Sequence, residues 1–410
     1  MTLQQTWPKV IILVDMNCFF AQIEQLDNPL LQNRPVAVTN GHQGTTIITS
    51  SYEARAFGIK TGMRLKEARL LCPDLIQAAS RPNRYAGIST TIMAALESIT
   101  PDLEVYSVDE AFLDVTHCQS LLGTPLEIGQ LVKDTVSKAS GLTCSIGVSG
   151  DKTTAKYAAK LKKPDGLTII EPWRSEAVLA PLHVTALSGI NKGTAAFFAQ
   201  YGVINCGDMK KIPISIPAKR FGNLGRRLWL MAQGKDPELI ITTVKDPKTI
   251  GHGKVMPPQT RDLSTILTYF QHMSEKVGSR LRKHAFKASS FFIGLKTEQG
   301  WLKSKIKLKQ ATNDGHVIFT QCRQFVMTHW QGQGAWQIQV TALNPHHEQQ
   351  GDLFIDNHLS DKRQQLNHAM DEINQRYGEF TLAPSRLLNK SVMPNVIAPS
   401  WKPTGHRKTI

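Results

Sequence analysis

The sequence predicts an α+β fold, because strand-forming and helix-forming runs alternate in two separate regions of the chain. In residues 9–173, strands and helices surround one central hairpin, which is typical of a ferredoxin-like core. After residue 250, further strands and helices indicate a second α+β unit. A chain of 410 residues is long enough for about two to four domains.

The first region opens with KVIILVD, residues 9–15, a short apolar run that indicates a buried strand. A helix is expected at 19–26, and the strands LEVYSV and AFLDV are expected to pair as an antiparallel hairpin. Further helices are expected at 83–98, 125–139 and 152–162, and further strands in PVAVTN, LTCSIGVS and GLTII.

The later part of the chain changes character twice. Short helices broken by Gly and Pro are expected from about 174 to 240, and residues 241–250 have the composition of a linker. In the second unit, helices are expected at 262–284 and near 316–329, and strands near 289–297, 301–309 and 335–343. The remaining tail is polar, with a helical pattern only in 361–377.

Net charge is the first indication of function. The chain has 48 Lys and Arg residues against 33 Asp and Glu, a net charge of +15. Residues 244–345 alone hold 15 basic and 5 acidic residues, so this region accounts for +10. Such a basic domain suits a polyanion and indicates nucleic acid; a charge that serves only solubility is the alternative.

The strand WLKSKIKLK has a period of two. Ile306 and Leu308 fall on one face, and the other face carries Lys303, Lys305, Lys307 and Lys309. Four ammonium groups in a row repel one another unless an anion lies along them, so the pattern fits a phosphate backbone. An ordinary solvated face is the alternative.

Three acids stand at the ends of predicted strands. Asp15 ends the first strand, and Asp109 and Glu110 lie in the central hairpin. Carboxylates that converge at one sheet edge can hold two magnesium ions for in-line displacement at phosphorus. Taken singly, Asp15 could cap the following helix, and the pair could be ordinary turn residues.

Composition excludes several classes of protein. No apolar run is long enough to cross a membrane, and the N-terminus lacks the features of a signal peptide, so a cytoplasmic location is expected. The six cysteines lack zinc-ligand spacing and are expected to be reduced and mostly buried. The pair His346–His347 is interpreted as surface.

Five motifs, in this order and spacing, closely resemble the Y-family DNA polymerases, and most of all bacterial DNA polymerase IV: VDMNCFFAQIEQ, SSYEARAFGIKTGM, YSVDEAFLD, GVSGDKTTAKYAAKLKKPDG and LSGI. The resemblance covers residues 9–345 and implies a right-hand polymerase with an additional domain. It implies a ferredoxin-like palm (1–18 and 83–173), small fingers (19–82), a helix-hairpin-helix-like thumb (174–240), a linker (241–250), a little finger (251–343) and a tail (344–410).

The resemblance also implies roles for single residues. Asp15, Asp109 and Glu110 match the metal-binding carboxylates, together with the Met16 carbonyl, and the cofactor is two Mg²⁺ ions, with Mn²⁺ as a substitute. Phe20 matches the steric gate against ribonucleotides. The incoming nucleotide is contacted by Phe19, Phe20, Thr49, Tyr52, Arg55 and Lys163, and the DNA by Lys192, Lys303, Lys305, Lys307 and Lys309. Physically, Arg and Lys neutralise a triphosphate.

Two positions depart from the family pattern. Asn17 stands where many DNA polymerase IV relatives have a second acid, and Asn191 replaces the second glycine of the hairpin turn. The first departure concerns the branch of the family. The second alters the turn at 189–193, which in the family contacts a DNA phosphate through its backbone, and Lys192 is expected to contribute to that contact.

The tail carries one short motif and one helical pattern. EQQGDLF resembles the peptide with which bacterial polymerases bind the sliding clamp, with Gln350, Leu353 and Phe354 as anchors; a polar linker is the alternative. Residues 364–380 resemble the C-terminal part of UmuC-type proteins. A helix there could dock a partner, within residues 361–410, or pack on its own protein.

The resulting expectation is a monomeric, low-fidelity translesion DNA polymerase of the bacterial cytoplasm and nucleoid, acting on primer-template DNA and deoxynucleoside triphosphates. One alternative is a non-catalytic Y-family-like scaffold for a mutagenic polymerase complex. Such relatives lose palm carboxylates, whereas this chain keeps three. A second alternative is a nucleotidyl cyclase built on a ferredoxin-like core. Such a cyclase would need neither the basic second unit nor a clamp-binding peptide.

Overall fold

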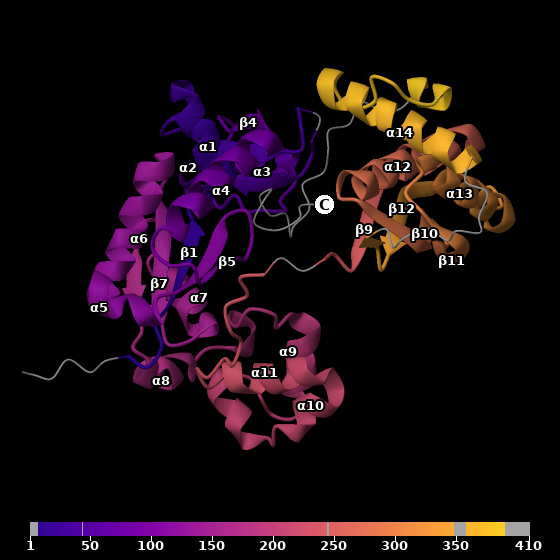
Figure 1. The fold of residues 1–410 in the computed structure, drawn as a ribbon. Helices are drawn as coiled ribbons and strands as arrows, with labels where there is room; N and C mark the ends of the chain where they lie inside the picture. Colours follow the sequence, from indigo (N-terminus) through magenta and orange to yellow (C-terminus); the bar gives the residue numbers. More distant parts are fainter. Residues whose placement is uncertain (1–6, 43, 244–245, 348–357, 390–410) are drawn as a thin grey trace, which may run out of the picture. The chain divides into compact units, whose positions relative to one another are not determined.

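Residues 7–42, 44–243, 246–347 and 358–389 are described in a computed structural model of the chain. The chain divides after residue 244 into two compact units, the second of which is coloured orange to yellow in Figure 1. Within the described residues, no helix combines the length and the apolar character that crossing a membrane requires.

The first unit is built on a five-stranded sheet with the order β5-β6-β1-β7-β8. The central strand β1 pairs antiparallel with β6 and β7, while β7 and β8 are parallel. These strands and their helices are β1 (Ile11–Met16), α4 (Pro82–Glu97), β5 (Leu103–Val105), β6 (Glu110–Asp114), α5 (Gln119–Leu122), α6 (Pro125–Ser140), β7 (Cys144–Ser149), α7 (Lys152–Leu161) and β8 (Leu167–Ile169).

Strand β1 is buried on both faces, which explains its continuous apolar sequence. Ile11 and Leu13 share a core with Ala155 and Ala159 of α7. Ile12 and its alternating neighbours face the other way, into the core that α4 and α6 cover. The strand is therefore held rigidly, and so is the acidic residue near its end.

A smaller sheet of order β3-β2-β4 lies between β1 and α4 in sequence. Its own core is formed by Ala37, Ile47 and Ile59 with apolar residues of the adjoining helices. The elements are α1 (Phe19–Asp27), β2 (Val36–Thr39), β3 (Ile47–Ser50), α2 (Tyr52–Ala56), α3 (Leu65–Leu71) and β4 (Ile76–Ala79).

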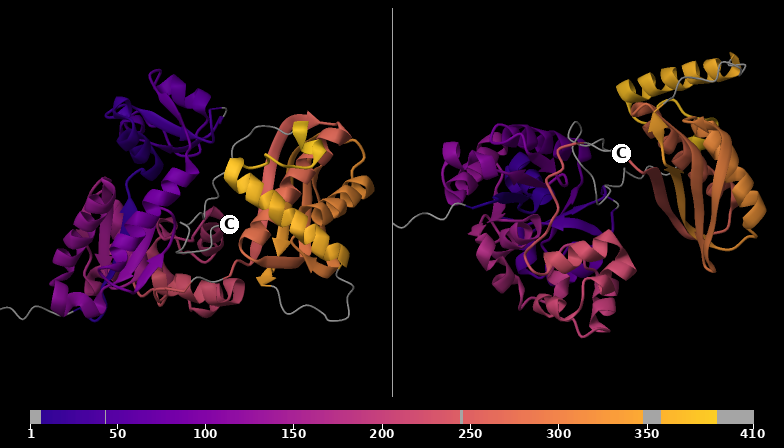
Figure 2. Two further views of the ribbon diagram at one scale, coloured as in Figure 1. Left: turned by 45° about the horizontal axis from the view of Figure 1, so that its top comes forward. Right: turned by 60° about the horizontal axis from the view of Figure 1, so that its bottom comes forward.

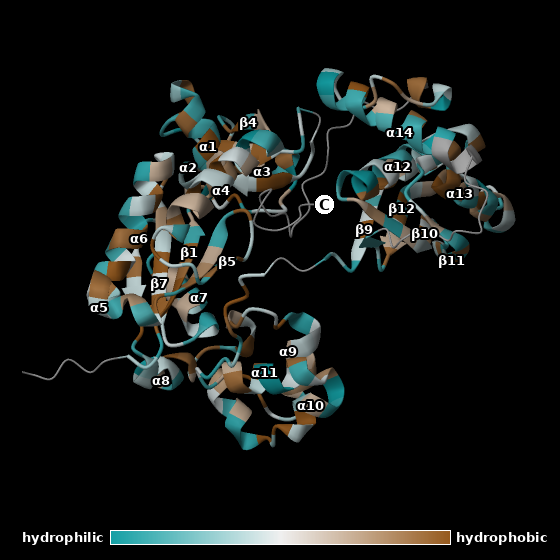
Figure 3. Ribbon diagram, in the orientation of Figure 1, coloured by the Kyte–Doolittle hydropathy of each residue, from teal (hydrophilic) through white to brown (hydrophobic). Residues whose placement is uncertain are grey.

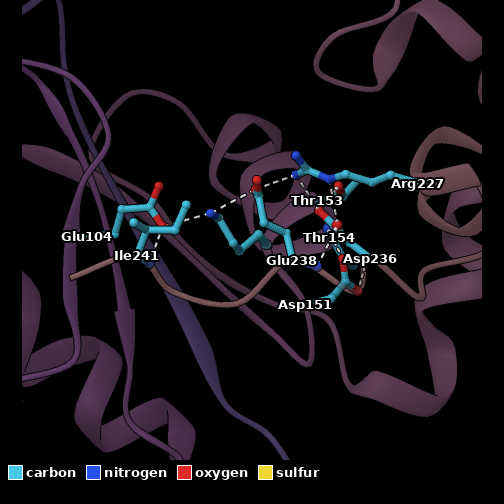
Figure 4. A network of polar contacts seen from close by, with 9 residues as sticks. Glu104, Asp151, Thr153, Thr154, Arg227, Asp236, Glu238 and Ile241 are labelled. Carbon is cyan, nitrogen blue, oxygen red and sulfur yellow. Dashed lines mark hydrogen bonds and ion pairs between the residues drawn. The ribbon is translucent and has the colours of Figure 1, made fainter. Parts of the chain in front are cut away.

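Short helices follow the large sheet and enclose a separate core around Phe198. They are α8 (Ser175–Leu179), α9 (Lys192–Ala199), α10 (Ser215–Phe221) and α11 (Asn223–Met231). Figure 4 shows the network of polar contacts that joins this helical segment to the large sheet. In it, Asp236 accepts hydrogen bonds from Thr153 at 2.7 Å and from Arg227 at 2.9 Å.

The second unit has a four-stranded antiparallel sheet of order β11-β10-β12-β9, and β13 pairs with β10. Helices α12 and α13 pack on this sheet (Figure 2) and bury a core around Phe270 and Phe291. The elements are β9 (Thr249–Thr260), α12 (Leu263–Lys283), β10 (Phe286–Thr297), β11 (Gly300–Thr312), α13 (Gly315–His329), β12 (Ala335–Leu343) and β13 (His346–His347).

The tail contributes helix α14 (His358–Tyr377), along which hydrophilic residues predominate (Figure 3). This helix packs on its own unit: Arg363 pairs with Asp314 at 2.8 Å, and Arg282 pairs with Asp371 at 2.6 Å. A short 3-10 helix, Ser385–Asn389, follows and buries Leu387. This helix was expected either to dock a partner or to pack on its own protein, and these contacts favour the second interpretation.

The expected α+β class is confirmed, and most expected elements are present with small shifts at their ends. The main difference is β9, which begins at Thr249 inside the predicted linker. Ile250 is fully buried, pairs with Ala342 and belongs to the core of the second unit. The six cysteines are free, and five of them are buried, as expected.

Candidate active site

Asp15 and Glu110 are direct neighbours across two strands. In the antiparallel pairing of β1 with β6, Asp15 lies opposite Glu110. Asp109 stands beside them, because the Met16 backbone N–H donates to the Asp109 carbonyl at 2.9 Å. Asp15 therefore meets Asp109 and Glu110, which lie 94 and 95 residues further along the chain, at one edge of the sheet.

Two of these acids are strongly shielded from water. Burial raises the pKa of Asp15 to about 6, against the lowering effect of the Lys163 ammonium, and the carboxylates of Glu110 and Asp109 add to the rise. Burial also raises the pKa of Asp109, whose carboxylate accepts a hydrogen bond of 2.6 Å from the Ser107 hydroxyl. The site thus concentrates negative charge where water solvates it poorly, an arrangement that favours a bound cation.

Two ammonium groups stand at these carboxylates. Lys163 Nζ lies 2.5 Å from Asp15 Oδ1, and Lys156 Nζ lies 2.8 Å from both carboxylate oxygens of Glu110. No group of three or more His, Cys, Asp or Glu side chains is placed to hold a metal ion within the described residues. The carboxylate oxygens are nevertheless the hard donors that a divalent cation prefers, and they attract cationic groups in this structure.

Phe20 lies at the start of α1, five residues after Asp15. It stacks on Tyr85 with 4.3 Å between ring centroids and an interplanar angle of 14°. Tyr85 is fully buried, and its hydroxyl donates to Glu24 at 2.6 Å. Arg81 holds the same carboxylate through its Nε at 3.0 Å. The position of the Phe20 ring is therefore fixed from behind.

Three residues of the predicted nucleotide site come from β3 and α2. Thr49 pairs with Val38 in the small sheet. Arg55 lies over the Tyr52 ring, 4.8 Å from its centroid, and its Nε donates to the Ser50 carbonyl at 3.1 Å. The Tyr52 hydroxyl is buried without a hydrogen-bond partner in the described part of the chain. A buried hydroxyl without a partner is costly, so this atom suits a polar ligand.

Both departures from the family pattern have a structural explanation. Asn17 is buried, donates to Thr143 at 3.0 Å and accepts from Ser145 at 2.9 Å, so its amide is satisfied without a metal. Asn191 is the N-cap of α9 and accepts from the Thr194 backbone at 2.9 Å. Its backbone is extended, with φ −87°, so this position does not require glycine.

The predicted lysine row is present in the second unit. Lys303, Lys305, Lys307 and Lys309 are all exposed on β11 and alternate with half-buried residues, including Leu302 and Ile306, that pack on the core. Lys192 is the first residue of α9 in the first unit. The expected clamp-binding anchors Gln350, Leu353 and Phe354 lie outside the described residues.

The sequence reasoning missed Lys156 and Tyr85. Lys156 lies in a quoted motif, in the middle of α7, whereas Lys163 follows the end of that helix, so the sequence could have offered Lys156 as a second lysine near the acids. Tyr85 could be connected with Phe20 only through the tertiary fold, because 65 residues separate them.

Comparison with known proteins agrees with this arrangement. Residues 14–160 match the model of the impB/mucB/samB family, and residues 247–353 match the C-terminal domain of that family. A DNA polymerase IV of Moorella thermoacetica is 34% identical over 90% of this chain and 94% of its own length. A DNA polymerase IV of Bacillus anthracis is 32% identical over 95% of this chain and 97% of its own length.

A solved Y-family DNA polymerase chimera has the same architecture. It superposes with a TM-score of 0.72 at 27% identity and covers 83% of this chain and 100% of its own. The right-hand polymerase architecture expected from the sequence is thereby confirmed. The chain belongs to the impB/mucB/samB family and, within the Y-family DNA polymerases, to the group of bacterial DNA polymerase IV.

Proposed function

We propose that the chain is a template-directed translesion DNA polymerase whose active centre is the edge of the large sheet. The observation that carries this assignment is the pairing of Asp15 with Glu110, with Asp109 beside them. These carboxylates, with the Met16 carbonyl, would hold the divalent cations on which the family depends. Magnesium fits best, since all of these ligands are hard oxygens, and manganese is a substitute.

In the proposed reaction the primer 3′-hydroxyl attacks the α-phosphate of a deoxynucleoside triphosphate, and pyrophosphate leaves. When bound, two divalent cations would supply activation of the hydroxyl and charge neutralisation at the leaving group. The protein's own part is to hold the reactants in line and to surround the triphosphate with cationic groups. Template pairing then selects the nucleotide, while the protein contacts mainly the backbone.

The nucleotide would lie between the carboxylates and α1. Arg55, Tyr52 and Thr49 would bind the triphosphate, with the Tyr52 hydroxyl gaining the partner that it lacks in the described structure. Lys163 would exchange its contact with Asp15 for a phosphate oxygen. Phe20, supported by the ring behind it, would exclude a ribose 2′-hydroxyl, with Phe19 beside it.

Each segment of the chain is assigned to one domain of the polymerase hand. We assign 1–18 and 83–173 to the palm, 19–82 to the fingers, 174–240 to the thumb and 251–343 to the little finger, joined by 241–250. Lys192 and the lysine row of β11 would contact DNA phosphates. Gln350, Leu353 and Phe354 in the tail 344–410 would bind the sliding clamp, and the chain would act as a monomer in the bacterial cytoplasm, at the nucleoid.

Primer extension tests the catalytic assignment. Asp109→Asn keeps the shape of the side chain but removes its charge, and it should slow extension by about a thousandfold, because metal-held charge is worth several kcal/mol. Asp102→Asn is the matched control, since Asp102 is an exposed acid at the start of the same hairpin. Equal extension by both variants would contradict the role of Asp109. A wild-type protein that binds the template without extending it would favour the scaffold.

A further inference from the structure

Lys156 is held in place from two sides. It projects from α7, and its ammonium lies 2.8 Å from each carboxylate oxygen of Glu110. The same ammonium lies over the Tyr106 ring, 4.4 Å from the centroid. Both side chains of the ion pair are largely buried, with 14% of Lys156 and 17% of Glu110 exposed. The two charges of such a pair attract each other more strongly than those of a pair on the open surface, because water screens them less.

The pair belongs to a larger balance of charge. Lys160 follows one helical turn after Lys156, and Lys163 contacts Asp15. Burial lowers the pKa of Lys160, and the neighbouring Lys156 ammonium lowers it further, while Glu110 and Asp15 act in the opposite direction. Three ammonium groups therefore lie near three carboxylates, and they offset the charge of the acids when no divalent cation is bound.

We propose that Lys156 is a positioning residue that holds Glu110 in the cation-free site and competes with the divalent cation for that carboxylate. The inference rests on the proposed role of Glu110 as a metal ligand. Both oxygens of Glu110 accept from one ammonium, so a cation that binds this carboxylate must share its oxygens with Lys156 at close range, where the two positive charges repel each other. The contact with the Tyr106 ring holds the ammonium beside the carboxylate, so that Lys156 would continue to orient Glu110 when a cation is bound.

Two variants separate positioning from mere charge. Lys156→Met keeps the length of the side chain and removes the competing ammonium, whereas Lys156→Arg keeps the charge. Lys162→Met is the control, because Lys162 is an exposed lysine at the end of the same helix and has no carboxylate partner among the described residues. The probe is Mn²⁺ alone, titrated into full-length protein without DNA or nucleotide and followed by the electron paramagnetic resonance signal of free Mn²⁺.

Lys156→Met should bind Mn²⁺ about tenfold more tightly than the wild type, because a positive charge that competes for the same carboxylate has been removed. Lys156→Arg and Lys162→Met should keep the wild-type affinity within about twofold. In primer extension, the Met variant should lose turnover at saturating metal, because its Glu110 is no longer oriented, while the Arg variant retains most of it.

Unchanged or weaker Mn²⁺ binding by Lys156→Met would overturn the inference while leaving the metal assignment intact. Mn²⁺ binding that survives substitution of both Asp109 and Glu110 by alanine would instead overturn the assignment of the ligands, and the inference with it. Loss of binding in both Lys156 variants would indicate a folding role for the ion pair and would likewise contradict competition.

Discussion

Lys152 ties the large sheet to the segment that follows the helical region. Only 3% of its side chain is exposed, and its ammonium lies 2.8 Å from Glu104 and 2.9 Å from Glu238. Glu104 also accepts a hydrogen bond of 2.8 Å from the Ile241 backbone N–H. We expect Lys152→Met, which preserves volume and removes charge, to destabilise the first unit strongly.

The size of the effect follows from what each carboxylate keeps. Glu238 is 28% exposed and retains its ion pair with Arg227 at 2.6 Å, so removing Lys152 should cost little stability at this carboxylate. Glu104 is only 9% exposed and retains a single backbone donor. Removing one partner of a buried ion pair costs about 3–5 kcal/mol of stability. Because Glu104 keeps the Ile241 backbone N–H as a donor, we expect Lys152→Met to lower the free energy of unfolding by about 3 kcal/mol.

A second substitution makes the reasoning falsifiable. Lys152→Met with Glu104→Gln leaves no unpaired buried charge and keeps an acceptor for Ile241, so it should recover about 2 kcal/mol. Urea unfolding of the full chain, followed by hydrogen exchange of peptides from α7 and α11, reports on the first unit separately from the second. A cost below about 1 kcal/mol for Lys152→Met, or no recovery in the double variant, would refute the argument.

Three further predictions concern selectivity, DNA contact and pH. Phe20→Val should lower discrimination against ribonucleotides by about 100-fold in single-nucleotide insertion, and an unchanged ratio would exclude a gate. The double variant Lys305→Ser with Lys307→Ser should make the plot of log affinity for primer-template against log salt concentration less steep, by about 0.9 per lost phosphate contact. Lys283→Ser, which alters an exposed lysine at the end of α12, is the control and should leave this slope unchanged. Burial raises the pKa of Glu275 from 4.5 to about 7, so the folded state binds this proton more tightly than the unfolded state does. The resulting contribution to stability is fully present below about pH 4.5 and is lost as the pH rises through about 7. Glu275→Gln should therefore stabilise the second unit by about 2 kcal/mol at pH 8 and by much less at pH 5, and an equal effect at both pH values in urea unfolding would contradict this.

Strand β1 and the lysine strand β11 were predictable because local pattern determines them. Burial on both faces requires an unbroken apolar run, and burial on one face requires alternation. The same patterns could not give the register that sets Asp15 opposite Glu110, because pairing depends on the hairpin and the helices together. The convergence of the acids was therefore an expectation until the pairing of β1 with β6 was known.

The remaining features depend on contacts between segments distant in sequence. No periodicity links Phe20 to Tyr85 or Lys156 to Glu110, because each pair is joined only when α1 and α4, or α7 and β6, pack together. Strand β9 was hidden for a different reason. Pro257 and Pro258 break its pattern, and a strand at the edge of a sheet tolerates proline, which a central strand does not.

The distribution of charge explains why a strongly basic chain gathers acids at one place. Lys156, Lys160 and Lys163 lie near Asp15, Asp109 and Glu110, so the six charges nearly cancel at the sheet edge. Under the proposed function, two divalent cations would then leave an excess of about four positive charges, close to the charge of a nucleoside triphosphate. Without the lysines, the same cations would mainly neutralise the carboxylates. The lysines thus set the charge that the site presents to its anionic substrate, and the carboxylates determine where that charge is concentrated.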